Sequence, residues 1–177
     1  TLEFQTEDEQ NNYLLFTYLQ KVGFDENTAT DIILKHSSNL FGYHGLAYEL
    51  GRISLEFFCM YFLQDTFLPK ETNAAAPIAQ VHHDIWHDIE DSIIGDGVNQ
   101  IGRIEPRGTR KSAFGTYATA CWCHAYAIKI YTLICSDIGT TAEKFIKDIK
   151  NNFLENKRIE KAFGKLLDDR DKRYICN

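Results

Sequence analysis

Long hydrophobic runs are missing from this sequence. No apolar stretch reaches the roughly 18–20 residues that a helix needs to cross a bilayer. The nearest candidate, Leu46–Leu63, is interrupted by Glu49, Arg52 and Glu56. A basic excess is missing too, because 25 Asp and Glu outnumber 19 Lys and Arg and give a net charge of −6. We therefore expect no membrane span and no nonspecific binding of nucleic acid, which needs a basic surface.

Proline is also scarce, and the cysteines are odd in number. Five cysteines, an odd number and mostly within apolar runs, indicate reduced thiols in a cytoplasmic chain rather than a disulfide framework. The three prolines, Pro69, Pro77 and Pro106, fall where helices should start or stop. The first residue is Thr1 and not Met, so we expect a trimmed or processed chain with no visible signal peptide.

Alternating β-branched runs, the usual sign of strands, are not evident, and the hydrophobic period is helical nearly throughout. We predict an all-α fold, a single-domain bundle over residues 1–177 with about six to seven helices. The third helix is apolar almost all round, so it should be central and most buried. The stretch Gly95–Lys111 should be an irregular, basic loop. The expected helices are Glu7–Lys21 (ended by Gly23), Thr28–His36 (capped by Asp25 or Asn27), His44–Gln64, Ala75–Ile94, Ser112–Cys135, Thr141–Asn156 and Lys157–Arg170.

The segment Val81–Asp96, VHHDIWHDIEDSIIGD, concentrates histidines and acidic residues on one expected helix. His83 and His87 are four apart and therefore lie one turn above the other. Imidazole and carboxylate at that spacing suit a divalent metal, although the same residues also fit an ordinary polar face of a bundle helix. Asp88 falls near the margin of the apolar stripe, where an unpaired carboxylate would cost several kcal/mol. The wheel places Ile78, Val81, Ile85 and Ile89 toward the core and His83, Asp84, His87 and Asp91 on the far side.

The run 87–96, HDIEDSIIGD, resembles the metal segment of HD-domain phosphohydrolases, most closely the branch of small 5′-deoxynucleotidases. That branch has an acid three residues after the His-Asp pair, here Asp91, and then Gly-Asp. His44 is placed like the family's earlier histidine, and Leu14–Gly23 resembles its opening helix. The family's last ligand is a downstream Asp, for which Asp137 and Asp148 are alternatives. A second register would place the pair at His83-Asp84.

The resemblance implies a helical enzyme that binds a divalent ion (Mn, Co, Mg, Fe or Zn) through His44, His87, Asp88 and Asp137 or Asp148. Such an ion would polarise a phosphoryl oxygen and lower the pKa of a bound water. Asp91 would orient or deprotonate that water, and Asp96 would contact the sugar or a neighbouring group. The implied substrate is a nucleoside monophosphate.

Arg103, Arg107, Arg110 and Lys111 lie in a glycine-containing stretch just before an expected helix start. Guanidinium groups pair with phosphate, and helix N-termini favour anions, so this loop could hold the substrate phosphate. Alternatively, it is a solvated loop whose positive charges balance those of acidic residues in the preceding helix.

Two further patterns have plain structural interpretations. Cys121, Cys123 and His124 form a C-x-C-H run, but on a helix the two cysteines point about 200° apart, so we expect buried structural cysteines. Glu49, Arg52 and Glu56 form a polar stripe on the central helix, which we interpret as ion pairing between Arg52 and the two glutamates. Such a stripe on so apolar a helix also implies a lined cavity or a partner surface.

Two classes of function follow. The first is a metal-dependent phosphohydrolase acting on a nucleotide-like phosphate ester. The second is a non-enzymatic helical interaction module, an adaptor, immunity-type inhibitor or complex subunit that binds a partner protein of basic character; a second copy of the chain stays an open alternative. A third, weaker alternative is nucleic-acid binding through the loop 103–111.

Overall fold

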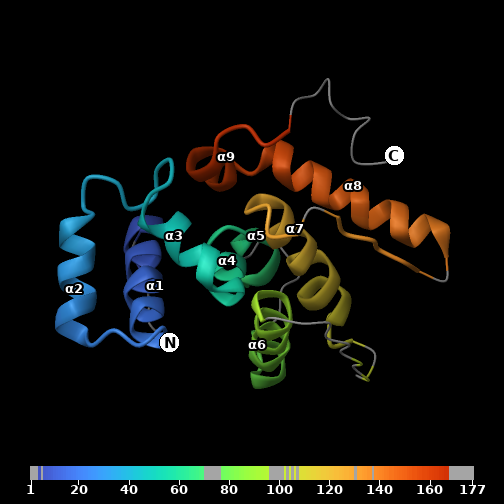
Figure 1. Cartoon of the computed structure of the whole chain (residues 1–177), viewed down its shortest axis with the longest axis horizontal. Coiled ribbons are helices and arrows are strands. Elements are labelled where there is room, and N and C mark those ends of the chain that lie inside the picture. The colour runs from blue at the N-terminus through green and yellow to red at the C-terminus, as the bar shows by residue number, and fades with distance from the viewer. Residues whose placement is uncertain are drawn as a thin grey trace.

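The computed structural model describes residues 4, 6–69, 77–95, 102, 104, 106, 108–129, 131–136 and 138–167. Within these residues all regular structure is helical (Figure 1), which confirms the predicted all-α fold. No helix in the described part of the chain is long and apolar enough to cross a membrane. The helices are α1 (Glu7–Lys21), α2 (Glu26–Lys35), α3 (Leu46–Ile53), α4 (Leu55–Tyr61), α5 (Gln64–Phe67), α6 (Gln80–Ile94), the π-helix η1 (Ser112–Tyr117), α7 (Ala118–Ala125), α8 (Gly139–Glu155) and α9 (Lys157–Phe163).

The first two helices form a hairpin and lie side by side in Figure 1. Thr6 caps α1 by accepting a hydrogen bond from the Glu9 N–H, and Asp25 caps α2 through the N–H groups two and three residues later. Gly23 makes the turn at φ 106°, a conformation that glycine adopts readily. Both helices therefore begin and end within two residues of the predicted bounds.

The predicted central helix His44–Gln64 is in the right place but is not continuous. Ser54 is extended, with φ −134° and ψ 112°, and separates α3 from α4. Its hydroxyl accepts a hydrogen bond from the Phe57 N–H and so caps α4. Serine competes with helical hydrogen bonding in this way, and an unbroken apolar pattern cannot reveal it. The prediction of deep burial is confirmed, because Phe57, Phe58 and Phe62 have no exposed surface.

The predicted helix Ser112–Cys135 is too long. It begins as η1, continues as α7 and ends at Ala125, after which Ala127 takes the left-handed φ of 50°. In the following extended segment, half-buried Thr132 and Ile134 alternate with exposed Tyr131 and Leu133. This is the period-two, β-branched pattern that we judged to be absent. The helix has already ended at Ala125, before this pattern begins at Tyr131.

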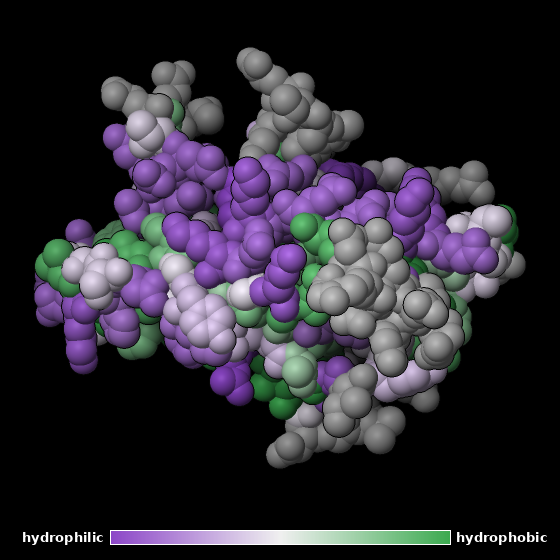
Figure 2. Space-filling view, turned by 90° about the horizontal axis from the view of Figure 1, so that it is seen from above, coloured by the Kyte–Doolittle hydropathy of each residue, from purple (hydrophilic) through white to green (hydrophobic). Residues whose placement is uncertain are grey.

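Two further helices are shorter than expected, whereas α8 (Gly139–Glu155) lies within two residues of its predicted bounds. The His-rich helix α6 begins at Gln80, since residues 77–79 are not helical; residues 70–76 lie outside the described part. At the other end of the chain, α9 stops before Gly164, which has φ 75°. Seen from above, hydrophilic side chains cover much of the upper face of the molecule (Figure 2).

The core gathers around α4, which packs against α1, α6 and α7. Aromatic rings dominate it: Phe67, Trp86 and Phe114 contact one another with centroids 4.8–5.4 Å apart. One side of α4, however, presents an acid to its neighbours. Glu56 is 2% exposed among these apolar residues.

Candidate acid-base site

The buried carboxylate of Glu56 is the centre of the candidate site. It lies in the first turn of α4, so the helix break at Ser54 fixes its direction. Three donors contact its Oε1 atom. Tyr18 Oη lies at 2.5 Å and Lys21 Nζ at 2.7 Å, both from α1, and His83 Nδ1 lies at 2.8 Å from α6. Three helices thus meet at one oxygen.

These donors keep Glu56 ionised. Burial alone would raise the pKa of Glu56, but hydrogen bonds from Lys21 and Tyr18 and the charge of Lys21 hold it below its ordinary value. Burial and the negative charge of Glu56 raise the pKa of Tyr18, so its hydroxyl remains a donor. The cluster therefore holds a negative charge in an otherwise apolar neighbourhood.

A second histidine and a second carboxylate border this centre. His87 Nε2 lies 3.4 Å from Glu56 Oε2, and its Nδ1 lies 3.7 Å from Glu90 Oε2. Glu90 Oε1 accepts hydrogen bonds from the Glu56 N–H and from Ser54 Oγ. Burial raises the pKa of Glu90, against these bonds and the charge of His87. The two acids of the site therefore shift in opposite directions, an arrangement typical of acid-base centres.

The contact with Glu56 determines the protonation pattern of His83. Because ionised Glu56 can only accept, Nδ1 of His83 must carry the proton and donate it to the carboxylate. The other ring nitrogen, Nε2, is then available to accept a proton. The side chain of His83 is 25% exposed and that of His87 is 63% exposed, so solvent reaches both imidazoles.

His82, next in the sequence, has a structural role instead. Its Nδ1 accepts a hydrogen bond from the Ala79 N–H, so Nε2 carries the proton and donates to the Thr109 carbonyl at 3.0 Å. Its ring also stacks on Phe114. Both nitrogens are thus used to start α6 and to hold residue 109.

The structure does not bring the described residues of the predicted metal set together. His44 precedes α3 and stacks between Tyr43 and Tyr48, with centroids 4.2 and 4.3 Å away, whereas His87 contacts Glu56 and Glu90. In the described part of the chain, no three His, Cys, Asp or Glu side chains are grouped so that they could hold a metal ion.

The predicted acids of this set are dispersed. Asp88 is exposed rather than at the margin of the core, and Asp91 is exposed as well, because α6 turns Glu90 toward α4 instead. Asp148 is exposed on α8. Asp96 and Asp137 lie outside the described residues.

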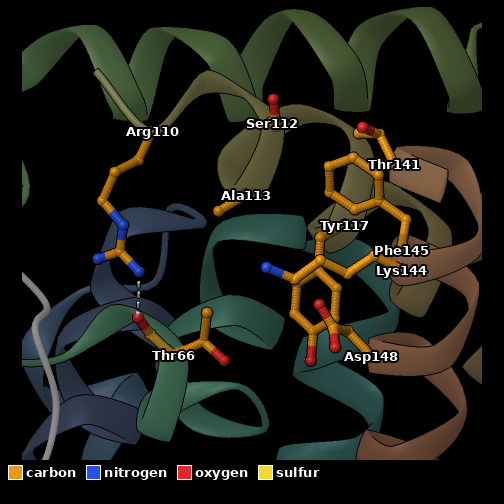
Figure 3. A pocket seen from close by; sticks show the side chains of 9 residues that line it. All are labelled: Thr66, Arg110, Ser112, Ala113, Tyr117, Thr141, Lys144, Phe145 and Asp148. Carbon is orange, nitrogen blue, oxygen red and sulfur yellow. Dashed lines mark hydrogen bonds between the residues drawn. The ribbon is translucent and has the colours of Figure 1, made fainter. Parts of the chain in front are cut away.

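The basic loop is described only in part, since Arg103 and Arg107 lie outside it. Arg110 donates to the Thr66 carbonyl at 3.1 Å and borders a pocket of about 490 Å³ between η1 and α8 (Figure 3). Lys111 is exposed. The loop therefore contributes one described cation to a pocket that is separate from the Glu56 cluster.

Of the two patterns that we interpreted as structural, the buried cysteines are confirmed and the ion pairing of Arg52 with Glu56 is not. Cys121 and Cys123 are buried, as predicted, and burial raises the pKa of their thiols to about 12 and about 11. The predicted pairing of Arg52 with Glu56 is wrong. Ser54 breaks the helix between them, and the Glu56 carboxylate is held by residues of α1 and α6.

Sequence reasoning missed the centre of this site. Glu56 was assigned to Arg52, and Tyr18, Lys21 and Glu90 were given no role. One signal was visible, namely an acid within the apolar run LEFFCMY, since a buried carboxylate needs donors. Which donors satisfy it depends on how α1 and α6 pack against α4.

Comparisons of the chain with protein-family models, with curated proteins and with solved structures found no match.

Proposed function

We propose that the chain hydrolyses a phosphate ester at the Glu56 cluster. One observation carries the proposal: two solvent-accessible imidazoles, His83 and His87, one turn apart on α6, face the same buried, ionised carboxylate. A carboxylate that fixes the tautomer of a histidine is a recurrent way to prepare a general base. The substrate class comes from the resemblance of the run 87–96 to HD-domain phosphohydrolases.

The residues suggest the following proton transfers. His83 Nε2 takes a proton from water as the water oxygen attacks phosphorus, and Glu56 supports the imidazolium that forms. His87, in its protonated form, gives a proton to the leaving oxygen as the P–O bond breaks. The Cβ atoms of residues one turn apart are about 5–6 Å from each other, which leaves room for a phosphoryl group between their ring ends. Lys21, whose side chain is 49% exposed, can neutralise phosphate oxygens.

A divalent ion is the cofactor that the resemblance implies. The described ligand candidates His44, His87 and Asp88 do not form a group that fits such an ion, so no step is assigned to a metal here. Dependence on Mn, Co, Mg, Fe or Zn is instead an outcome to be measured.

The experiment is a hydrolysis assay of the purified chain. The substrates are p-nitrophenyl phosphate, bis(p-nitrophenyl) phosphate and nucleoside monophosphates, each with EDTA and with each of the five ions. We expect turnover of at least one ester, and His87→Asn should lower kcat by about 100-fold or more. His36→Asn is the matched control, because His36 is an exposed histidine at the end of α2. Absence of turnover under every condition, or equal loss in both variants, would refute the proposal.

A second candidate, the interaction module, is favoured by the exposed apolar side chains of the extended segment. Tyr131 is 78% exposed and Leu133 is 71% exposed, and such side chains are typical of contact surfaces. This alternative predicts no turnover. It also predicts a concentration-dependent sedimentation coefficient if the partner is a second copy, which the double substitution Tyr131→Ser and Leu133→Ser should remove.

A further inference from the structure

The pocket between η1 and α8 has the features of a binding site for a small ligand. Its volume, about 490 Å³, is within the range of about 300–1,000 Å³ that small-molecule sites occupy. Two segments far apart in the sequence build it. η1 supplies Tyr117, and α8 supplies Lys144, Phe145 and Asp148. Asp148 is four residues after Lys144 and three after Phe145, so it lies beside both on the helix surface.

Two cations reach into this pocket from opposite sides (Figure 3). Arg110 enters from the loop before η1, and its guanidinium is anchored by the Thr66 carbonyl. Lys144 enters from α8 and is exposed. Neither side chain forms an ion pair with any carboxylate that the structure describes, and of the described residues that line the pocket only Asp148 is acidic, so two cations face one carboxylate.

The backbone at Arg110 supports a specific role for this side chain. Arg110 has φ 54°, a left-handed conformation that is unfavourable for a residue with a side chain by about 1 kcal/mol or more. The adjoining η1 is a π-helix, a conformation that occurs frequently at functional sites. Both features occur at residues that line the pocket, Arg110 and Tyr117.

The rest of the pocket is aromatic and acidic. The rings of Phe145 and Tyr117 form one wall, and the Asp148 carboxylate lies beside the Tyr117 hydroxyl, away from Arg110 (Figure 3). A flat ring could pack against the wall while its anionic group meets Arg110 and Lys144. Asp148 would accept a hydrogen bond from a donor at the other end of the ligand.

We propose that this pocket binds a small aromatic or heteroaromatic anion with a phosphate-like group at one end and a hydrogen-bond donor at the other. The pocket is distinct from the Glu56 cluster and does not depend on hydrolysis there. Binding to the pocket can be tested with phosphonates, because an enzyme that hydrolyses phosphate esters does not cleave their C–P bond. A positive result therefore stands even if no ester is hydrolysed.

The test is isothermal titration of the full chain with phenylphosphonate, 4-aminophenylphosphonate and inorganic phosphate. We expect both arylphosphonates to bind more tightly than phosphate, and the amino compound to bind most tightly. Lys144→Gln should weaken arylphosphonate binding about tenfold, the effect of losing one charge-assisted hydrogen bond. Asp148→Asn should weaken 4-aminophenylphosphonate binding but not phenylphosphonate binding.

Lys147→Gln is the matched control, because Lys147 is exposed on the same helix but does not border the pocket. It changes the net charge by the same amount, so binding to this variant should equal binding to the unsubstituted chain. Equal weakening in Lys144→Gln and Lys147→Gln would show a general charge effect and overturn the proposal. So would inorganic phosphate binding as tightly as the arylphosphonates, or no binding by any of the three.

Discussion

Glu56 and Glu90 are two carboxylates of one site whose pKa values shift in opposite directions. Glu56 is held by Tyr18, Lys21 and His83, which lower its pKa against the effect of burial. For Glu90, burial exceeds the effect of its hydrogen bonds and raises the pKa. At the residue scale, the same environment therefore stabilises one negative charge and opposes the other.

This contrast predicts opposite effects of pH on the two glutamine variants. Because the pKa of folded Glu56 is depressed, its contribution to stability is present above the ordinary value of 4.5 and is lost as the pH falls through the folded value. Glu56→Gln should therefore lower the free energy of unfolding by about 3 kcal/mol at pH 7, and the loss should shrink below pH 4.5.

The pKa of folded Glu90 is raised, so its contribution is present below 4.5 and is lost as the pH rises through the folded value. Glu90→Gln keeps an oxygen acceptor and should be more stable than the unsubstituted chain at pH 7, but not at pH 4. Urea denaturation between pH 4 and 7 measures both variants, with exposed Glu49→Gln as the control. The same sign for both variants at pH 7 would contradict this account.

At the element scale, the contact between α3 and α7 depends on a glycine. Gly51 is buried, and a Cβ built on it would lie 2.5 Å from Tyr126 Oη and 3.0 Å from a Phe62 ring carbon. Tyr126 cannot move freely, since its hydroxyl donates to the Tyr48 carbonyl and its ring packs against Phe163. Close approach of the two elements therefore requires the absence of a side chain.

We predict that Gly51→Ala lowers the free energy of unfolding by about 1–3 kcal/mol, the usual cost of overpacking a core. Gly115→Ala in η1 is the matched control, because a Cβ there meets nothing within 4 Å, and it should be neutral or slightly stabilising. Thermal melting of both variants is the measurement. If the Gly51→Ala chain is as stable as the Gly115→Ala chain, Tyr126 can shift to admit the new Cβ without lowering the free energy of unfolding, and the prediction is wrong.

The sequence predicts elements well where caps mark them. Thr6 and Asp25 cap the first two helices within two residues of their expected starts. It fails where a local feature interrupts an apolar pattern, at Ser54 in the central helix and at Ala127 after α7. Both interruptions are local hydrogen-bonding or backbone effects that periodicity over a long window averages out.

For the whole molecule, composition and helical period were enough to predict an all-α fold. Only part of the candidate site could be predicted from the sequence, because the spacing of His83 and His87 indicates a site whereas nothing comparable marks Glu56. Its partners Tyr18, Lys21 and His83 are 38, 35 and 27 residues away in the sequence. Only the packing of α1, α4 and α6 brings them to one oxygen.

The central claim is that Glu56 positions His83 for catalysis and does not merely stabilise the fold. Its most direct test is kcat and KM of Glu56→Gln for the best ester, at a temperature where circular dichroism shows the variant to be folded. We predict that kcat falls about 100-fold or more while KM changes little, because the carboxylate orients the base without contacting substrate. An unchanged kcat in the folded variant would contradict the account.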